Sequence, residues 1–351
     1  MSTQNEPIRG RGSSHNPANR FTDKTVSSFE YFDEPLPAPK LQVNADHAKT
    51  VISKNDSPDV GFDYSLNPYR GCEHGCSYCY ARPTHEYLGL SAGIDFETRI
   101  FAKYDAGKIL RETLADTKWK PAPLILSSVT DPYQPIEQRL GITRDCLQVL
   151  NETRHPVGVI TKNHGITRDV DLLADLASDN LCRVTISVTT LDGDLVGKLE
   201  PRTSRPNRRL EAIRKLSEAG IPVNVNVAPV IPGLNDHEIP SILEAASQAG
   251  ASTAAYIVLR LPWAVNPLFL DWLDTHLPDR KDKILNRVRD LRDGKLNNTN
   301  FGERMKGSGH WADLYRTSFY AHCNRYGLGK PDLNMNNELF KRPTGPQLTL
   351  F

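Results

Sequence analysis

Residues 71–82 read Gly-Cys-Glu-His-Gly-Cys-Ser-Tyr-Cys-Tyr-Ala-Arg, which places Cys72, Cys76 and Cys79 at C-x3-C-x2-C spacing. Three of the six cysteines of the chain therefore lie within eight residues. Thiolates are soft ligands that select iron–sulfur clusters or zinc. In a chain without secretory features, clustered cysteines indicate metal binding rather than disulfides. Because such sites usually take four ligands, a triplet leaves one coordination position open.

Two kinds of metal site fit this spacing. The first is a zinc knuckle, in which His74 or His85 completes the ligand set of the three cysteines. The second is an iron–sulfur cluster with one iron left open to a non-protein ligand. The spacing alone leaves both interpretations open.

The loop resembles the signature of the radical S-adenosylmethionine (SAM) enzymes, because Tyr78 directly precedes the last cysteine. The resemblance implies that Cys72, Cys76 and Cys79 hold a 4Fe-4S cluster whose fourth iron chelates the amino and carboxylate groups of SAM. An electron from a flavodoxin- or ferredoxin-like donor would then release a 5′-deoxyadenosyl radical. The longer pattern, Gly-Cys-x-His-x-Cys-x-Tyr-Cys-Tyr-Ala-Arg, is most similar to the branch that includes spore photoproduct lyase.

From Phe62 onward, short apolar runs rich in β-branched residues alternate with segments of helical periodicity. Strands are predicted at 64–67, 124–126, 157–161, 184–189, 223–228 and 255–261, with helices over 106–114, 146–150, 170–176, 210–216 and 239–246. This alternation predicts an α/β fold with a parallel sheet and crossover helices. The pattern alone permits an open doubly wound sheet or a full barrel, whereas the resemblance implies a partial (β/α)6 TIM-like barrel.

Composition divides the chain into four parts. We expect a flexible N-terminal arm over 1–45, a core barrel over 60–262, a helical C-terminal extension over 263–330, and a linker with a terminal peptide over 331–351. The arm carries Arg9, Arg11 and Arg20, which suit either a phosphate backbone or a solvated terminus. The extension mixes basic, acidic and aromatic residues, so it fits a nucleic-acid surface or a solvated helical face.

In a parallel barrel, ligands gather at the carboxyl ends of the strands. By resemblance, Thr130, Lys162 and Ser187 contact SAM through its methionyl end or ribose, and Tyr78 lies where the backbone meets adenine. Asp131 follows a strand and precedes a proline, so its carboxylate is expected either to bind the SAM amino group or a substrate, or to form an ordinary turn. The arginine-rich segment 200–209 offers a clamp for a carboxylate or phosphate, although the sequence does not select the residue.

The chain departs from spore photoproduct lyase in its hydrogen-atom donor. That family uses a cysteine near the end of its second strand, where this chain has Ser127 and Ser128. Because a serine O–H bond is too strong for the role, we do not expect the lyase reaction. Cys323, in an aromatic helix, is predicted as a hydrogen-atom relay, although the same aromatic stripe is typical of a core.

The chain ends in an apolar peptide after a segment rich in proline and glycine. Gln347, Leu348, Leu350 and Phe351 resemble the Gln-Leu-x-Leu-Phe motif by which bacterial polymerases and repair proteins bind the DNA sliding clamp. The leucines and the phenylalanine would enter apolar pockets of the clamp as an extended peptide. The alternative is a tail that folds back onto its own domain.

These observations predict a radical SAM enzyme that acts on nucleic acid, in the manner of a DNA-repair enzyme. A net charge of +1 identifies no partner, and no apolar run approaches the roughly 20 residues that span a bilayer. We therefore expect a cytoplasmic protein without membrane contact. The alternatives are a radical SAM enzyme that modifies RNA or protein, and a non-catalytic metal-binding adaptor recruited to the clamp.

Overall fold

The computed structural model describes residues 7–22 and 39–344, and its main sheet contains six parallel strands. The strand order is β10-β9-β8-β7-β6-β3, with β2 antiparallel to β3 at the edge. The strands are β2 (Ile52–Lys54), β3 (Tyr64–Leu66), β6 (Leu124–Leu126), β7 (Val157–Thr161), β8 (Cys182–Val188), β9 (Val223–Val230) and β10 (Thr253–Val258). Within the described residues no ladder joins β10 to β3, so the barrel is open. The predicted partial (β/α)6 barrel is confirmed.

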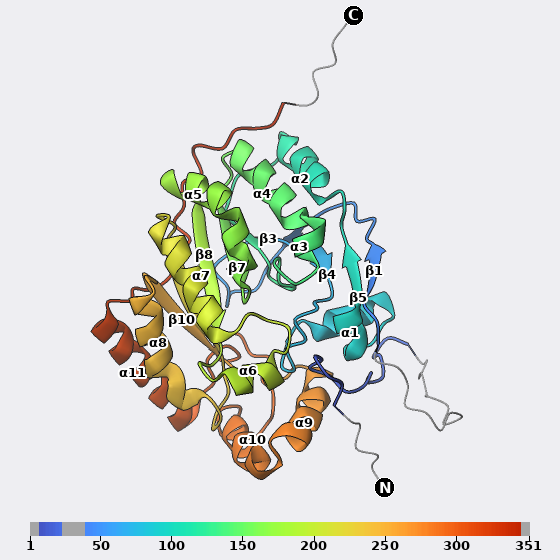
Figure 1. The fold of residues 1–351 in the computed structure, drawn as a ribbon, viewed down its shortest axis with the longest axis vertical. Coiled ribbons are helices and arrows are strands. Elements are labelled where there is room, and N and C mark those ends of the chain that lie inside the picture. Colours follow the sequence, from blue (N-terminus) through green and yellow to red (C-terminus); the bar gives the residue numbers. More distant parts are fainter. Residues whose placement is uncertain (1–6, 23–38, 345–351) are drawn as a thin grey trace, which may run out of the picture.

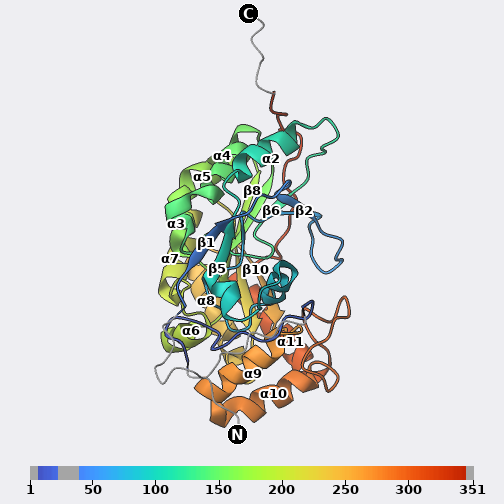
Figure 2. The ribbon, with the colours of Figure 1, turned by 90° about the vertical axis from the view of Figure 1, so that its right-hand side faces the viewer.

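Helices follow the strands and cover one side of the sheet, as Figure 2 shows. They are α2 (Ala106–Ala115), α3 (Glu137–Leu140), α4 (Ile142–Glu152), η2 (His164–Asp169), α5 (Val170–Ser178), α6 (Gly193–Leu199), α7 (Pro206–Glu218), η3 (Asp236–Glu238) and α8 (Ile239–Gln248). Their periodic apolar residues, such as Leu110, Leu173 and Ile213, are fully buried in the main core. Gly220 and Gly250 follow α7 and α8 with φ of 76° and 101°, conformations that glycine adopts without strain.

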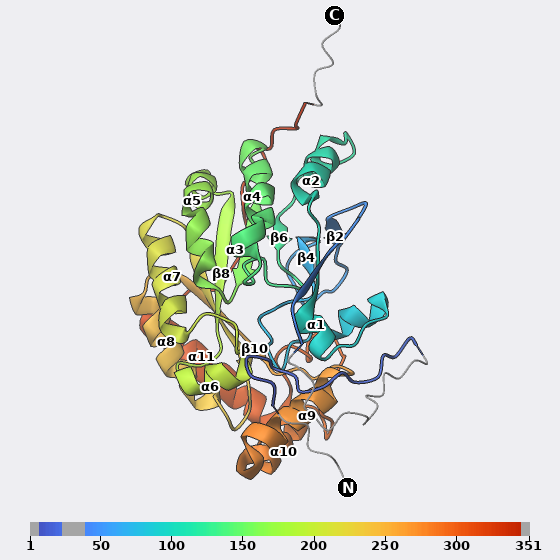
Figure 3. The same ribbon diagram turned by 45° about the vertical axis from the view of Figure 1, so that its right-hand side comes forward.

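A second, three-stranded sheet lies beside the barrel in the order β1-β5-β4. Its strands are β1 (Gln42–Ala45), β4 (Tyr69–Arg70) and β5 (Arg99–Ala102), and it adjoins η1 (Arg82–Leu88) and α1 (Ile94–Thr98). Figure 3 shows β4, α1 and the α2 end of the barrel together on this side of the molecule.

The C-terminal helices are α9 (Val265–His276), η4 (Pro278–Arg280), α10 (Lys281–Asp290) and α11 (Gly309–Tyr326). Helices α9 and α10 form a separate apolar core with Leu199 of α6 and with Cys76 and Tyr78. They lie near α6, at the end of the barrel opposite α2 and α4 (Figure 1). Helix α11 packs on α8. None of the helices in the described part of the chain is both long and apolar enough to cross a membrane.

The expected flexible termini need correction where the structure describes them. Residues 42–45 form β1, and Gly12 and Ser13 are buried. Near the other end, the Asn336 N–H donates to the Asn180 carbonyl at 2.9 Å and the Lys341 N–H to the Thr153 carbonyl at 2.8 Å. Low hydrophobicity suggested disorder at both ends, but backbone hydrogen bonds hold these segments, and composition does not reveal such bonds.

Candidate active site

The cysteine loop, residues 71–82, is held by backbone hydrogen bonds to two other segments, α1 and the end of α6 with the turn after it. The Cys72 N–H donates to the Phe96 carbonyl (2.9 Å), and the Ser77 N–H to the Leu199 carbonyl (2.9 Å). The His74 carbonyl accepts from the Arg202 N–H at 3.2 Å. The loop begins at Gly71, whose φ of 77° and close approach to the Phe96 carbonyl exclude a side chain.

The three thiols of the loop are free, and the environment of each is poor for an isolated thiolate. Cys72 and Cys76 are 7% and 8% exposed. Burial raises the pKa of all three thiols, and the other cysteine charges raise the pKa of Cys72 and Cys76 further. A bound metal centre supplies the positive charge that such buried thiolates need. The donor set therefore fits a metal centre.

The two kinds of metal centre that the spacing permits bind their thiolates differently. A zinc knuckle gathers its ligands around one metal, whereas a 4Fe-4S cluster binds each thiolate through a different iron. Among the described residues, no three His, Cys, Asp or Glu side chains are arranged to hold one metal ion. His74 Nδ1 lies 3.4 Å from Asp131 and His85 Nε2 lies 2.9 Å from the Arg99 carbonyl, while His85 Nδ1 is buried without a hydrogen-bond partner among the described residues.

A buried ion pair between Arg82 and Glu97 supports the cysteine loop. Arg82 and Glu97 are both fully buried, and Arg82 Nη2 donates to Glu97 Oε1 at 2.6 Å. Arg82 Nε also donates to the carbonyl of Cys76 at 3.0 Å. Because buried charges survive only when they are paired, this arginine has a fixed position, and it fixes the backbone of a predicted cluster ligand.

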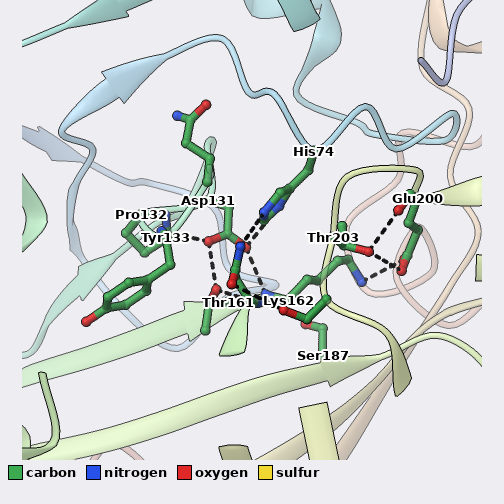
Figure 4. Close-up of polar contacts among 12 residues, drawn as sticks. His74, Asp131, Pro132, Tyr133, Thr161, Lys162, Ser187, Glu200 and Thr203 are labelled. Atoms are coloured by element: carbon green, nitrogen blue, oxygen red, sulfur yellow. Dashed lines mark hydrogen bonds and ion pairs between the residues drawn. The ribbon is translucent and has the colours of Figure 1, made fainter. Parts of the chain in front are cut away.

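Asp131 joins the loops that follow β6 and β7 to the cysteine loop (Figure 4). Its carboxylate accepts from Thr161 Oγ1 at 2.7 Å, from the Lys162 N–H at 2.8 Å and from the Tyr133 N–H at 2.9 Å. His74 Nδ1 lies 3.4 Å from the same carboxylate, and burial lowers the pKa of this histidine. The structure thus gives Asp131 internal partners, and its contact with SAM stays a prediction.

Lys162 reaches across the rim of the barrel toward β8 and β9. Its Nζ donates to the Ala228 carbonyl at 2.8 Å and to Thr189 Oγ1 at 3.0 Å, and lies 3.3 Å from Glu200 Oε1. Burial lowers the pKa of Lys162 to about 7, and the nearby charge of Arg209 adds to the shift. The lysine therefore lies where several strands end together.

Glu200 contacts Lys162, Arg209 and Tyr78 at this end of the barrel, and no pattern in the sequence singles it out. The fully buried carboxylate pairs with Arg209 and accepts from the hydroxyl of Tyr78. Burial raises the pKa of Glu200, and Arg209 opposes that rise. The arginine-rich segment was recognised in the sequence, but only the fold shows that Arg209 is the arginine that turns inward.

The structure brings most of the predicted SAM residues to one rim. Thr130 is buried and donates to the Tyr69 carbonyl at 3.0 Å, and Ser187 lies near the end of β8 with 5% exposure. Cys323 lies elsewhere, in the core between α11 and β10 with Tyr256 and Phe319, so the structure gives its predicted relay role no support. The predicted clamp-binding residues, Gln347 to Phe351, lie outside the described residues.

Comparison with known proteins adds family evidence to this geometry. A sequence model described as "Radical SAM superfamily" matches residues 66–246. An uncharacterised protein of Mycobacterium tuberculosis is 34% identical over 246 residues, which cover 69% of this chain and 71% of the relative. A radical SAM Nα-GlyT isomerase of Pseudomonas phage M6 is 23% identical over 273 residues, 75% of this chain and 54% of the relative.

Among solved structures, spore photoproduct lyase complexed with a dinucleoside spore photoproduct superposes with a TM-score of 0.57. The match covers 82% of this chain and 81% of the lyase, at 17% identity. At this identity the likeness establishes the fold, and it agrees with the open six-stranded barrel.

Proposed function

The chain belongs to the radical SAM superfamily, and we propose that it acts on single-stranded or extruded nucleic acid at the mouth of its barrel. It is an enzyme whose cofactors are a 4Fe-4S cluster and SAM, which supply a 5′-deoxyadenosyl radical on reduction. We assign the cluster to Cys72, Cys76 and Cys79. An external donor of flavodoxin or ferredoxin type would provide the electron.

The side chains at the carboxyl end of the barrel would bind and orient SAM. We assign SAM contacts to Tyr78, Thr130, Asp131, Lys162 and Ser187, which lie on the loop or at the ends of β6, β7 and β8. Hydroxyl groups and an ammonium group suit a ribose and a carboxylate. Helices α9 and α10 pack against the loop and exclude water from that side of the site.

The observation that carries the nucleic-acid proposal is a set of three exposed rings, one in the cysteine loop and two in the segments after β10, each with an arginine over it. Tyr80, Trp263 and Phe301 are 53%, 61% and 58% exposed. The matching guanidinium groups are Arg260 at 5.9 Å from the Tyr80 ring, Arg20 at 4.4 Å from Trp263 and Arg304 at 4.5 Å from Phe301. We call these six residues the aromatic rim. Stacking rings beside cations are the elements with which proteins bind single strands.

Two residues of the aromatic rim have features that packing alone does not explain. Trp263 has a φ of 45°, a strained conformation for a large residue, and still exposes its indole. Arg260 Nε is buried without a hydrogen-bond partner among the described residues, and its Nη1 donates to the sulfur of Met305 at 3.7 Å. Its remaining donors suit a phosphate.

Titration of a fluorescent single-stranded oligodeoxynucleotide tests this proposal. Trp263→Ala should weaken binding by about 1–3 kcal/mol, roughly 5- to 150-fold, because one stacking surface is lost. Arg260→Ala should weaken binding and reduce its salt dependence by about one phosphate contact. A matched RNA strand and a duplex, titrated in parallel, distinguish DNA from RNA and single strands from paired ones.

Tyr104→Ala is the matched control, because Tyr104 is 51% exposed and no arginine lies over its ring in the described part of the chain. This variant should bind like the wild-type protein. Equal binding by the Trp263 and Tyr104 variants would contradict the proposal, as would a wild-type protein that binds neither DNA nor RNA strands. Crosslinking to a polypeptide instead would support the alternative of a protein substrate.

We also propose that the C-terminal peptide Gln347–Phe351 binds a DNA sliding clamp. The described segment before it is anchored by Arg342, which donates to the carbonyls of Leu114 and Trp119 at 3.1 and 3.0 Å. Both carbonyls belong to the stretch that precedes β6, so this anchor lies at the end of the sheet opposite the cysteine loop. A truncation after Pro346 should lose clamp binding and retain SAM cleavage, and unchanged clamp binding would refute the proposal.

A further inference from the structure

An N-terminal strap, residues 10–20, lies against the cysteine loop and its neighbours. Figure 3 shows this dark-blue segment between α1 and α9. The strap is held at intervals along its length. Ser14 Oγ donates to Asp271 of α9 at 2.5 Å, and Asn19 Nδ2 donates to the carbonyls of Glu86 and Leu90 at 2.9 and 2.8 Å. The strap thus ties α9 to the helices that follow the cysteine loop.

Two glycines allow the strap to approach this closely. A Cβ atom added to Gly12 would lie 1.6 Å from the carbonyl oxygen of Gly75, inside the cysteine loop. From the other side, a Cβ atom added to Gly93 would lie 2.0 Å from the carbonyl oxygen of His15 in the strap. Both contacts are with backbone atoms, which cannot rotate aside as a side chain would. Any side chain at either position must therefore lift the strap.

Glu97 connects the strap to a predicted cluster ligand. Its Oε2 accepts from the Gly12 N–H at 3.1 Å, while its Oε1 accepts from Arg82 Nη2 at 2.6 Å. Arg82 in turn donates to the Cys76 carbonyl at 3.0 Å. Glu97 and Arg82 are both fully buried, so the Gly12 N–H takes the place of water at the carboxylate while the strap is docked.

We propose that the strap is a positioning element for the cluster, with Gly12 and Glu97 as its positioning residues. Docking of the strap completes the support of the cysteine loop and covers it, so that the loop retains its iron. Lifting the strap leaves one oxygen of Glu97 without its partner and exposes the loop to solvent. The inference concerns the cluster, which family membership supplies, and does not depend on the nature of the substrate.

The test is the rate at which reconstituted protein loses its visible iron–sulfur absorbance to an iron chelator under anaerobic conditions. Gly12→Ala and Gly93→Ala should each lose the cluster at least about tenfold faster than the wild-type protein. Gly61→Ala is the control, because its Cβ atom meets nothing within 4 Å. No nucleic acid is present, so failure here is distinct from failure of the aromatic rim to bind a substrate.

Two further readouts separate positioning from a general effect on folding. Trypsin should cut the Gly12 and Gly93 variants within the strap, after Arg11 or Arg20, under conditions that leave the wild-type strap intact. Urea unfolding of the cluster-free variants should match that of the Gly61 control. If Gly12→Ala does not fold, Gly93→Ala tests the same interface from its other side.

Each outcome bears on the proposal. Rapid iron loss together with strap cleavage and normal unfolding supports it. A variant whose strap is cleaved while its cluster persists as in the wild-type protein would overturn it. A strap that stays resistant to trypsin in both variants would overturn the claim that the two glycines allow it to dock.

Discussion

The carboxyl and amino ends of the parallel sheet use opposite means to hold their residues in place. At the carboxyl end, two fully buried ion pairs, Arg82–Glu97 and Glu200–Arg209, surround the cysteine loop. At the amino end, the neutral ring of His155 is enclosed by Trp119 and Phe340. Buried ion pairs are costly to desolvate and fix geometry, whereas aromatic packing mainly stabilises. The difference indicates that the carboxyl end is built for position and the amino end for stability.

The largest expected effect comes from breaking a buried pair at the carboxyl end. Arg209→Leu would leave the Glu200 carboxylate buried without its arginine, and should lower the free energy of unfolding by about 3–5 kcal/mol. Urea unfolding of the cluster-free protein measures this change. Arg214→Leu, on the exposed face of the same helix, should change it by less than about 0.5 kcal/mol. Similar losses in both variants would show that the pair is not the cause.

The amino end should respond to pH through His155. Its Nε2 accepts from Trp119 Nε1 at 3.1 Å, so the ring must be neutral at this nitrogen, and burial lowers the pKa of His155 to about 4. An unfolded histidine titrates near 6.5. Between pH 4 and pH 6.5 the folded state therefore binds fewer protons than the unfolded state. The contribution of His155 to stability is complete above pH 6.5 and is lost as the pH falls toward 4.

The expected loss from this single group is about 2–3 kcal/mol. His155→Gln keeps an acceptor for Trp119 but does not titrate. Between pH 7 and pH 4, the free energy of unfolding of the His155→Gln variant should fall by about 2–3 kcal/mol less than that of the wild-type protein. Parallel pH curves for the two proteins would contradict the assignment of a neutral His155.

The smallest expected effect comes from Phe340, one of the two aromatic residues that enclose His155. Phe340→Ala removes an edge-on contact with His155, whose ring centroid lies 5.4 Å away, and should cost about 1–2 kcal/mol of stability. SAM cleavage by the folded variant should not change, because Phe340 lies at the amino end. A fall in cleavage without a fall in stability would break the contrast between the two ends.

Periodicity was sufficient to predict parallel strands that alternate with helices, because six apolar runs and the helices between them each repeat a simple local pattern. The partial barrel was implied by the resemblance of the cysteine loop. The cysteine spacing likewise predicted the centre of the candidate site. Glu200, Arg209 and Glu97 escaped prediction because a charged residue in a sequence reads as exposed, and only tertiary structure shows which charges are buried in pairs. Cys323 was predicted from its aromatic neighbours, and the structure places these neighbours in the main core, so its relay role stays a prediction.

The strap escaped prediction for a related reason. Gly12 and Gly93 stand in segments that read as turns or as a polar arm, and their function lies in contacts with distant backbone. The close approach of two backbones leaves no periodic signal in a sequence.

The most direct test of the central claim is SAM cleavage by the anaerobically reconstituted protein on reduction with dithionite. The wild-type protein should bind a four-iron cluster and release 5′-deoxyadenosine, whereas Cys76→Ala should release no more than a protein-free control. Absence of 5′-deoxyadenosine from wild-type protein that carries its cluster would contradict the account.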